Sequence, residues 1–438
     1  MAASETVEIT EYFLHYVWKH RLFSAIDLKT SDGFPVSVIH PGYAHADAGP
    51  DFKQSVIRIG NFTWAGDVEI HIKSSDWIRH CHHHNPKYDS VILHVVYEND
   101  LEIYRYGNEK YPVLELKDLI SPKLIDEYRK LTFSEKKIPC ASQIGHIEKL
   151  SFISVLSRMG LDRLFRKRKW ILGLLDQCKG DWNELFFRFV VMNFGFKTNN
   201  AAFELLARSM PYKYIKIHSN VKLQVYALFF GQAGLLNEEM NDDYYDRLRS
   251  EYHYLQYKYR LAPIQEKNWN YLRLRPRNFP ALRLAQLSEL WYHHPDFLKE
   301  LLENPCGEIA SKLTEYSPDI YWKTHYRFGK TTPPHEIKLG AATADLLWIN
   351  AVIPLLFSYG TFHGNEDLKE KALSMLEEIH FEDNKITRIY KKAGFPCNGA
   401  LYSQAVMELH HYFCTGKKCL DCEIGCIILK KKTATKES

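Results

Sequence analysis

The sequence lacks two features that mark membrane proteins and secreted proteins. Among its 438 residues, no apolar run approaches the roughly 20 residues that a helix needs to cross a bilayer. The first residues, MAASETVEITEYF, have neither the basic region nor the apolar region of a signal peptide. We therefore expect a cytoplasmic protein that does not associate with membranes.

A strong excess of one charge is also absent. Lysine and arginine total 57 and aspartate and glutamate total 53, so the formal net charge is only +4. This balance does not by itself indicate a nucleic-acid partner, although it can hide a local basic patch. With 45% hydrophobic and 25% charged residues, the chain has the composition of an ordinary globular protein, and its length allows two or three domains.

Apolar periodicity divides the chain into three parts. The first part has the order helix, three strands, short helix, strand, with the helix at 7–22 and the strands at 34–40, 51–59, 63–73 and 89–98. A further strand is expected at 111–118. Thr10 is a candidate N-cap of the helix, and the run 89–98 is apolar enough for a buried central strand. We expect an α+β protein. It would comprise an α/β sandwich with a mixed sheet (1–120), a helical domain (121–380) and a small helical unit rich in cysteine (381–438).

Four ionisable side chains share one face of the strand 63–73, because strand side chains repeat with period two: Asp67, Glu69, His71 and Lys73. Asp51 begins the hairpin partner, so Asp51 and Glu69 are expected to converge on one cation. Carboxylate oxygens suit Mg²⁺ or Mn²⁺. His71 or Lys73 would then orient or activate a water molecule. The alternative is a charged hairpin face that is merely solvated.

The pair Pro50-Asp51, with Glu69-Ile70-His71 on the following strand, resembles the PD-(D/E)xK nuclease superfamily. In that superfamily the aspartate begins the second core strand and the (D/E)xK motif lies on the third. The resemblance implies a restriction-endonuclease-like fold over the N-terminal part, with Glu11 on the first helix as a further catalytic acid. The sequence differs from the superfamily motif at one position. His71 stands where the motif has lysine, and Lys73 lies two residues beyond, which affects the expected chemistry more than the expected fold.

The segment SSDWIRHCHHHNPKYDSVILH contains five histidines, His80, His82, His83, His84 and His94. Neutral histidine is a common metal ligand, but no standard zinc spacing such as HExxH is present. We expect His82 to lie in a loop and contact a substrate phosphate. We expect His94, inside an apolar strand, to be a core histidine, and Asp76 and Trp77 to hold the loop.

Several of these stretches also resemble an uncharacterised family of bacterial proteins that carries only a domain-of-unknown-function label. They are GPDF, GDVEIH, SSDW, VILHVVYE, LRLRPRNFPALRLAQL and the terminal cysteine segment. The resemblance covers nearly the whole chain. It implies no established activity.

Two basic stretches interrupt the helical part. RLFRKRKW (163–170) has five basic residues, and YLRLRPRNFPALR places four arginines around a proline: Arg273, Arg275, Arg277 and Arg283. Arginine next to aromatic residues suits phosphate contact and base stacking, so the four arginines are predicted to bind nucleic acid. The alternatives are a solvated helix face for the first stretch and an arginine-pinned turn for the second.

The C-terminal part has a cysteine cluster with the spacing C-x16-C-x4-C-x2-C, formed by Cys397, Cys414, Cys419 and Cys422. Four thiolates suit Zn²⁺ or a [4Fe–4S] cluster. Cys426, His410 or His411 is a substitute ligand, and buried thiols without a metal are the alternative. Some DNA glycosylases and some PD-(D/E)xK nucleases carry a C-terminal cluster that this one resembles.

These features together predict a metal-dependent nuclease that hydrolyses phosphodiester bonds in DNA or RNA. The first alternative is a non-catalytic nucleic-acid-binding or scaffold protein with a degenerate nuclease-like fold and a structural metal site. The second is a different hydrolase that uses the histidine-rich loop. Protein partners are not predicted by the sequence.

Overall fold

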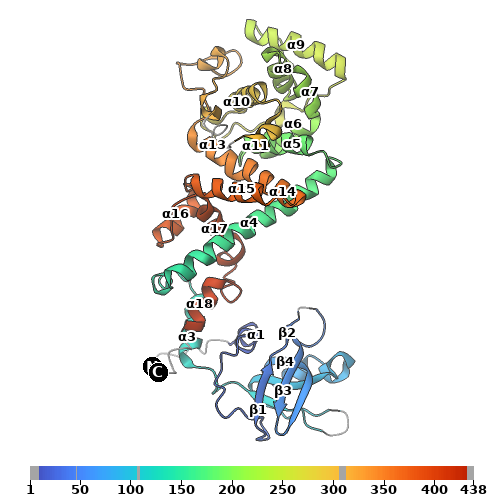
Figure 1. Ribbon diagram of the computed structural model, residues 1–438, viewed down its shortest axis with the longest axis vertical. Helices are drawn as coiled ribbons and strands as arrows, with labels where there is room; N and C mark the ends of the chain where they lie inside the picture. Colours follow the sequence, from blue (N-terminus) through green and yellow to red (C-terminus); the bar gives the residue numbers. More distant parts are fainter. Residues whose placement is uncertain (1–8, 46, 106–108, 305–311, 432–438) are drawn as a thin grey trace. The chain divides into compact units, whose positions relative to one another are not determined.

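The computed structural model describes residues 9–45, 47–105, 109–304 and 312–431 (Figure 1). The chain divides into two compact units. The first comprises Met1–Val155, Lys392–Gly394 and Leu409–Ser438, and the second comprises Leu156–Lys391 and Phe395–Glu408. The segment 381–438, which we expected to form a unit of its own, is therefore shared between the two.

The first unit is built on a six-stranded mixed sheet with the order β1-β3-β4-β5-β6, and β2 pairs beside β3. The strands are β1 (Val36–His40), β2 (Tyr43–Ala44), β3 (Phe52–Ile59), β4 (Phe62–Lys73), β5 (Val91–Glu98) and β6 (Val113–Glu115). Neighbours from β1 to β4 are antiparallel, whereas β4, β5 and β6 are parallel. An α+β fold with a mixed sheet in the N-terminal part and a helical body after it is thus confirmed.

Helix α1 (Glu11–Lys19) packs against β4. Thr10 caps the helix as predicted, since its Oγ1 accepts a hydrogen bond from the Phe13 amide at 3.2 Å. Phe13, Val17 and Trp18 are fully buried. The helix is shorter than the predicted span 7–22, of which residues 7 and 8 lie outside the described part of the chain. The helix also carries Glu11 and His15, which belong to the surroundings of the candidate site described in the next subsection.

Strands β3 and β4 form the predicted hairpin, and a β-bulge interrupts their pairing near its open end. The register shifts between Phe52 and Ser55, and Gln54 adopts a left-handed φ of 59°. Strand β5 is buried from Val91 to Val96, as its apolar run predicts. It lies between β4 and β6, where both of its edges are hydrogen-bonded.

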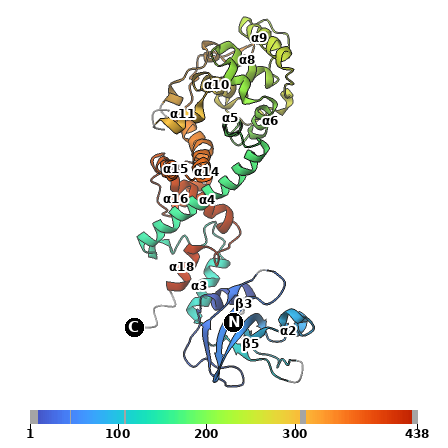
Figure 2. The same ribbon diagram turned by 45° about the vertical axis from the view of Figure 1, so that its right-hand side comes forward.

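Helices from opposite ends of the sequence meet in the first unit. Helix α3 (Pro122–Thr132) packs beside α18 (Glu423–Lys431), as Figures 1 and 2 show. Short elements complete the unit around the sheet: α2 (Asp76–Arg79), the 3₁₀ turns at His82–His84, Pro86–Tyr88 and Ile144–His146, and a π-helical turn at His410–Cys414.

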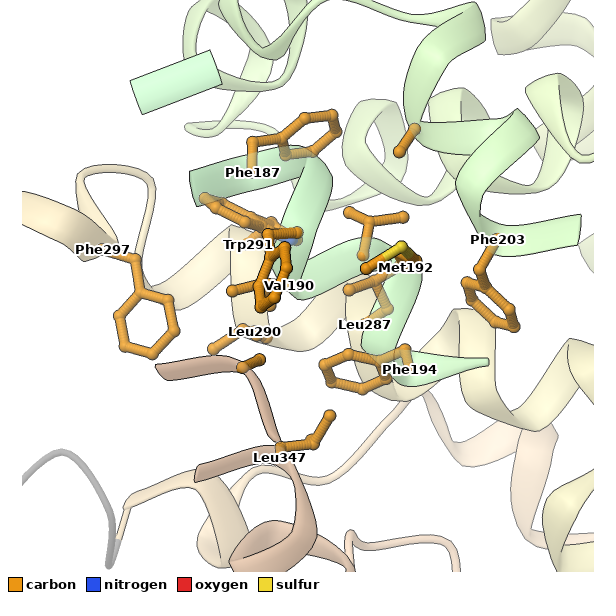
Figure 3. Packing of buried hydrophobic residues seen from close by; sticks show 14 of the residues in the cluster. Phe187, Val190, Met192, Phe194, Phe203, Leu287, Leu290, Trp291, Phe297 and Leu347 are labelled. Atoms are coloured by element: carbon orange, nitrogen blue, oxygen red, sulfur yellow. The ribbon is translucent and has the colours of Figure 1, made fainter. Parts of the chain in front are cut away.

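The second unit is almost entirely helical. Its helices are α4 (Lys149–Gln177, which begins in the first unit), α5 (Trp182–Phe194), α6 (Asn200–Ser209), α7 (Tyr212–His218), α8 (Lys222–Gln232), α9 (Asp243–Tyr259), α10 (Pro280–His293), α11 (Phe297–Glu303), α13 (Ala341–Leu347), α14 (Ile353–His363), α15 (Glu366–Glu378), α16 (Lys385–Lys392) and α17 (Ala400–Leu409). A small hairpin of β7 (His325–Arg327) and β8 (Lys330–Thr331) lies among them. Helix α5 is central to the core, and Figure 3 shows its Phe187, Val190, Met192 and Phe194 packed with Leu287, Leu290 and Trp291 of α10.

One helical stretch of the second unit, Ala341–His363, is long and apolar enough to cross a membrane by length and composition. We expected no such run from the sequence. Residues of this stretch belong to the hydrophobic core, and 67% of its most apolar window is buried. This burial is what a core helix requires, and the cytoplasmic location stays a prediction.

The basic stretch 163–170 makes internal contacts in the second unit. The Nε of Arg163 donates to Gln404 Oε1 at 2.6 Å, and Arg166 pairs with the buried Glu408. Lys167 Nζ donates to the Ile349 carbonyl at 3.2 Å and to Asn350 Oδ1 at 3.1 Å. Part of this stretch therefore stabilises the helical body and is not available as a nucleic-acid surface.

Candidate functional site

Two hydrogen bonds connect Asp51 with Glu69 and its neighbour Ile70 across the open end of the β3–β4 hairpin. The Asp51 amide donates to Glu69 Oε2 at 3.1 Å, and the Ile70 amide donates to Asp51 Oδ2 at 3.0 Å. Asp51 immediately precedes β3, and Glu69 lies on β4. The hairpin therefore brings the two carboxylates together, as the sequence predicts.

Three histidine side chains gather beside Glu69. One ring nitrogen from each of His71, His80 and His82 lies within 4.8 Å of the other two, which is close enough for a shared metal ion. His82 Nε2 lies 3.1 Å from Glu69 Oε1, and His71 Nε2 lies 3.5 Å from the same oxygen. We call Asp51, Glu69, His71, His80 and His82 the carboxylate–histidine site.

The loop after β4 holds its histidines by ring packing. The His82 ring stacks on Tyr88 with centroids 3.8 Å apart. Trp77 is fully buried and contacts His71, His82 and His94. Asp76 accepts the Lys73 amide and pairs with Arg79, so it fixes the turn from β4 into α2.

His94 lies behind the site, on β5. Its Nε2 is 2.9 Å from His71 Nδ1, and the side chain is fully buried, as expected of a core histidine. When His71 donates Nδ1–H to His94, the Nε2 atom of His71 keeps its lone pair, which faces Glu69 Oε1 at 3.5 Å and His80 Nδ1 at 3.2 Å. Metal-binding histidines commonly have this kind of outer partner.

Burial controls the protonation of the site. It raises the pKa of Glu69 to about 9, and the neighbouring charge of Asp51 adds to this effect. It lowers the pKa of His71 to about 2 and that of His94 to about 3, and it also lowers the pKa of His82. Burial thus favours the neutral form of His71, His82 and His94, and neutral imidazole is the form that binds metals.

Helix α1 adds two side chains one turn apart, Glu11 and His15. His15 Nε2 lies 3.2 Å from Asp51 Oδ2. Burial lowers the pKa of His15, but the hydrogen bond and charge of Asp51 outweigh burial and leave this pKa above its ordinary value. Burial also raises the pKa of Glu11, which lies within electrostatic reach of His80 and Asp51. His15 was not predicted, although its spacing of four residues from Glu11 on an amphipathic helix was a usable signal.

Lys73 lies away from the acidic pair, at the end of β4. Its side chain is about half exposed. Among the described residues it forms an ion pair with Asp100, with Nζ 4.0 Å from Oδ2. The predicted role of Lys73 in activating water has no structural support. The other residue predicted to activate water is His71. Its imidazole is neutral, so it suits the role of a metal ligand better than that of a proton donor.

A hollow of about 420 Å³ opens beside Asp51. Its lining includes His45, Lys53 and Lys87, two acids, Asp47 and Asp67, and the Gly49-Pro50 turn. Asp67 is occupied by hydrogen bonds from the Gln54 amide at 3.1 Å and from Ser90 Oγ at 2.7 Å. His45 Nε2 lies 3.9 Å from Asp47 Oδ2, so Lys53 and Lys87 are the side chains of the lining that would meet an anion.

The four arginines predicted to bind nucleic acid lie in the second unit and differ in exposure. Arg273, Arg275 and Arg277 are exposed. Arg283 is only 7% exposed, and its two Nη atoms donate to Asn278 and Gln286 at 2.6 Å and 2.8 Å. Burial lowers its pKa to about 10. For Arg283 the geometry is that of the arginine-pinned turn, and it gives no support for phosphate contact.

The predicted cysteine ligands fall in different units. Cys397 belongs to the second unit, whereas Cys414, Cys419 and Cys422 belong to the first. Cys426 of the first unit donates from Sγ to the Leu420 carbonyl at 3.2 Å.

The fold and the site define an α+β protein with a carboxylate–histidine site on a mixed sheet and a helical body. Within that class, the chain belongs to the family described as "protein of unknown function (DUF2851)", whose model matches residues 11–385. The family expected from the sequence motifs is thereby confirmed. No curated protein and no solved structure matches the chain.

Proposed function

We propose that the carboxylate–histidine site binds a divalent transition-metal ion and hydrolyses phosphodiester bonds in DNA or RNA. The proposal rests on the contacts of the Glu69 carboxyl group. Its Oε2 accepts a hydrogen bond from the Asp51 amide, and its Oε1 lies near Nε2 of His71 and Nε2 of His82. Two carboxyl groups and three imidazoles in one partly buried place form a donor set that suits a cation.

The donor set also decides which cation to test. Mg²⁺ is bound almost entirely by oxygen ligands, whereas the first-row ions from Mn²⁺ to Zn²⁺ also bind nitrogen ligands, Mn²⁺ most weakly. The involvement of His80 and His82 therefore favours Mn²⁺ over the Mg²⁺ that the acidic pair alone would suggest. His71, at the lysine position of the nuclease motif, fits the role of a ligand held in place by His94.

The arrangement of elements supports a nuclease-like fold. Helix α1 is followed by an antiparallel set of strands, then by a short helix and by β5 parallel to β4. Asp51 at the head of β3 and Glu69 on β4 occupy the places that the PD-(D/E)xK resemblance assigns to the two acids. Glu11 and His15 approach Asp51 from α1, the helix on which the resemblance places an extra acid.

The side chains in and around the carboxylate–histidine site would have separate roles in this reaction. The bound metal ion would polarise the phosphodiester and lower the pKa of a water nucleophile. Lys53 and Lys87 would hold a substrate phosphate in the hollow beside Asp51. His15 fixes the Asp51 carboxylate, and His94 fixes the ring of His71.

The test is a cleavage assay on the full chain with plasmid DNA, single-stranded DNA and RNA in the presence of Mn²⁺. We expect cleavage of at least one substrate that is lost on chelation and falls at least about 100-fold in Asp51→Asn and Glu69→Gln. Glu115→Gln, an exposed acid on β6, should cleave like the unchanged chain. Equal cleavage by all three variants, or failure of Mn²⁺ to bind the unchanged chain, would refute the proposal.

The non-catalytic alternative is favoured by a different observation, the exposure of Arg273, Arg275 and Arg277. It predicts salt-sensitive nucleic-acid binding that needs no metal ion and produces no cleavage. The same samples distinguish the two functions, because binding that survives Asp51→Asn while cleavage is absent in every condition supports this alternative.

A further inference from the structure

A pocket of about 270 Å³ opens in the second unit, with a lining from the loop between α5 and α6, the turn before α10 and helix α13. We call it the Arg283 pocket. Its apolar lining residues are Phe194, Phe196, Phe203, Leu274 and Leu346. Figure 3 shows Phe194 and Phe203 in the core to which this wall belongs. Ligand pockets commonly have mostly apolar walls with a few polar groups, and their volumes begin near about 300 Å³, so this pocket suits a small ligand.

The charged groups of this lining are all cations. They are Lys197, which is exposed, and Arg283, which is buried. Among the described residues that line the pocket there is no aspartate and no glutamate. A ligand that enters the pocket therefore meets apolar side chains and positive charge.

Arg283 brings to the pocket a buried guanidinium whose described partners are neutral. Its Nη atoms donate to the amide oxygens of Asn278 and Gln286, and its Nε is buried without a hydrogen-bond partner among the described residues. Arginine is almost never fully buried unless it is paired with an acid, yet Arg283 is only 7% exposed. Because guanidinium has five N–H donors, these two hydrogen bonds leave donors for an anion.

The packing around Arg283 holds the guanidinium in one place. Phe196 turns through a left-handed φ of 47°, and the centroid of its ring lies 4.9 Å from the Cζ of Arg283. Gln286, which accepts from Arg283, donates in turn to the Ile337 carbonyl at 2.9 Å. A guanidinium that is already ordered loses little conformational freedom when it binds a ligand.

We propose that the Arg283 pocket binds a small organic carboxylate, with its carboxylate group at Arg283 and its apolar body against the phenylalanine and leucine side chains of the lining. The planar fork of guanidinium matches the two oxygens of a carboxylate. One carboxylate charge also balances the one buried cation, and the apolar walls suit an organic anion better than an inorganic one. The proposal is independent of the nuclease activity, since Arg283 and the rest of the lining belong to the second unit.

The first test compares probes that share an apolar body and differ in charge. Benzoate with benzamide, and phenylacetate with phenylacetamide, are titrated into the full chain and followed by nuclear magnetic resonance. At least one carboxylate should bind, and its neutral amide should bind at least about tenfold more weakly, because the amide cannot accept a charge-assisted bond at both oxygens. Binding of neither carboxylate, or equal binding of a carboxylate and its amide, overturns the proposal.

Variants then place the bound carboxylate. Arg283→Met should weaken binding of the carboxylate probe at least about tenfold. A second pair of variants keeps Arg283 and its hydrogen bonds. Thr343→Trp fills the pocket from α13 and should abolish binding, whereas Ala342→Trp, an exposed residue of the same helix outside the lining, should bind like the unchanged chain. Equal binding by the two tryptophan variants would contradict the assignment of the pocket.

A competition experiment tests the other occupant that the positive charge suggests, a single-stranded nucleic acid. The exposed residues Arg273 and Arg275 flank Leu274 of the lining. Oligothymidylate is therefore added to the chain loaded with the carboxylate probe. We expect the probe to stay bound, since its site lies inside the pocket. Displacement of the probe from the unchanged chain would assign the pocket to nucleic acid and overturn the proposal.

Discussion

His71 and His94 form a hydrogen-bonded pair across adjacent parallel strands, with Nδ1 of His71 at 2.9 Å from Nε2 of His94. His94 lies outside the His71–His80–His82 triad, in the buried strand β5. Its hydrogen bond with Nδ1 of His71 holds the ring so that Nε2 of His71 faces Glu69.

The first prediction concerns this outer partner. His94→Phe fills the same buried space but removes the hydrogen bond to His71, so Mn²⁺ affinity should fall by about 10- to 100-fold. Isothermal titration calorimetry on the full chain measures the change. His84→Ala, in the same loop but outside the triad, is the matched control. Equal affinities for the two variants would show that His71 needs no orienting partner.

The second prediction concerns the hollow beside Asp51. Lys87 is exposed and lines it, so Lys87→Ala should raise KM for a nucleic-acid substrate while kcat changes little. The slope of log affinity against log salt should also become shallower by about 0.7 to 0.9. Lys123→Ala, exposed on α3 and outside the lining, should change neither quantity. A fall in kcat alone would place Lys87 in the chemical step instead.

The third prediction tests the packing of the helical body. Gly231 of α8 lies against the ring of Tyr252 on α9, where an added Cβ would come within 2.1 Å of a ring carbon. Gly231→Ala should therefore lower the free energy of unfolding of the second unit by about 1 to 3 kcal/mol, measured by urea unfolding followed by circular dichroism. Gly173→Ala, in α4 with no atom within 4 Å of the new Cβ, should raise it by about 0.5 to 1 kcal/mol. Similar effects from both substitutions would contradict the tight α8–α9 contact.

The fourth prediction concerns pH. Burial, assisted by the charge of Arg163, lowers the pKa of Lys167 to about 7, whereas a lysine in the unfolded chain titrates near about 10.4. Below about pH 7 the folded chain bears the full cost of the buried charge. Between about pH 7 and 10.4 the folded chain loses the proton first, so this cost disappears and stability rises with pH.

Removing the amine should remove this dependence. In Lys167→Met the unfolding free energy of the second unit should rise less steeply between pH 7 and pH 10 (about the two pKa values) than in the unchanged chain. Calorimetry at several pH values gives the comparison. Lys169→Met, an exposed residue of the same helix, should keep the original slope. Parallel slopes for the Lys167 variant and the unchanged chain would mean that Lys167 stays charged when folded.

Local patterns were enough to predict much of the first unit. The cap at Thr10, the β3–β4 hairpin and the buried strand β5 all follow from interactions between residues near in sequence. The proximity of Asp51 to Glu69 follows from the hairpin itself. The roles of these acids stay predictions.

Other parts of the site depend on contacts that no local pattern encodes. His15 meets Asp51 only because α1 packs on β4, and His80 joins the triad only because the loop folds back over the strand. Arg283 looked like part of an exposed basic loop, but the first turns of α10 are buried on all sides.

The division of the chain into units has a consequence for its synthesis. The second unit is nearly continuous in sequence, whereas the first needs both Met1–Val155 and Leu409–Ser438. On the ribosome, the helical unit can complete its core while the sheet-containing unit still waits for its last helix. The sheet with the carboxylate–histidine site is therefore made first, but its unit is complete only after α18 has been synthesised.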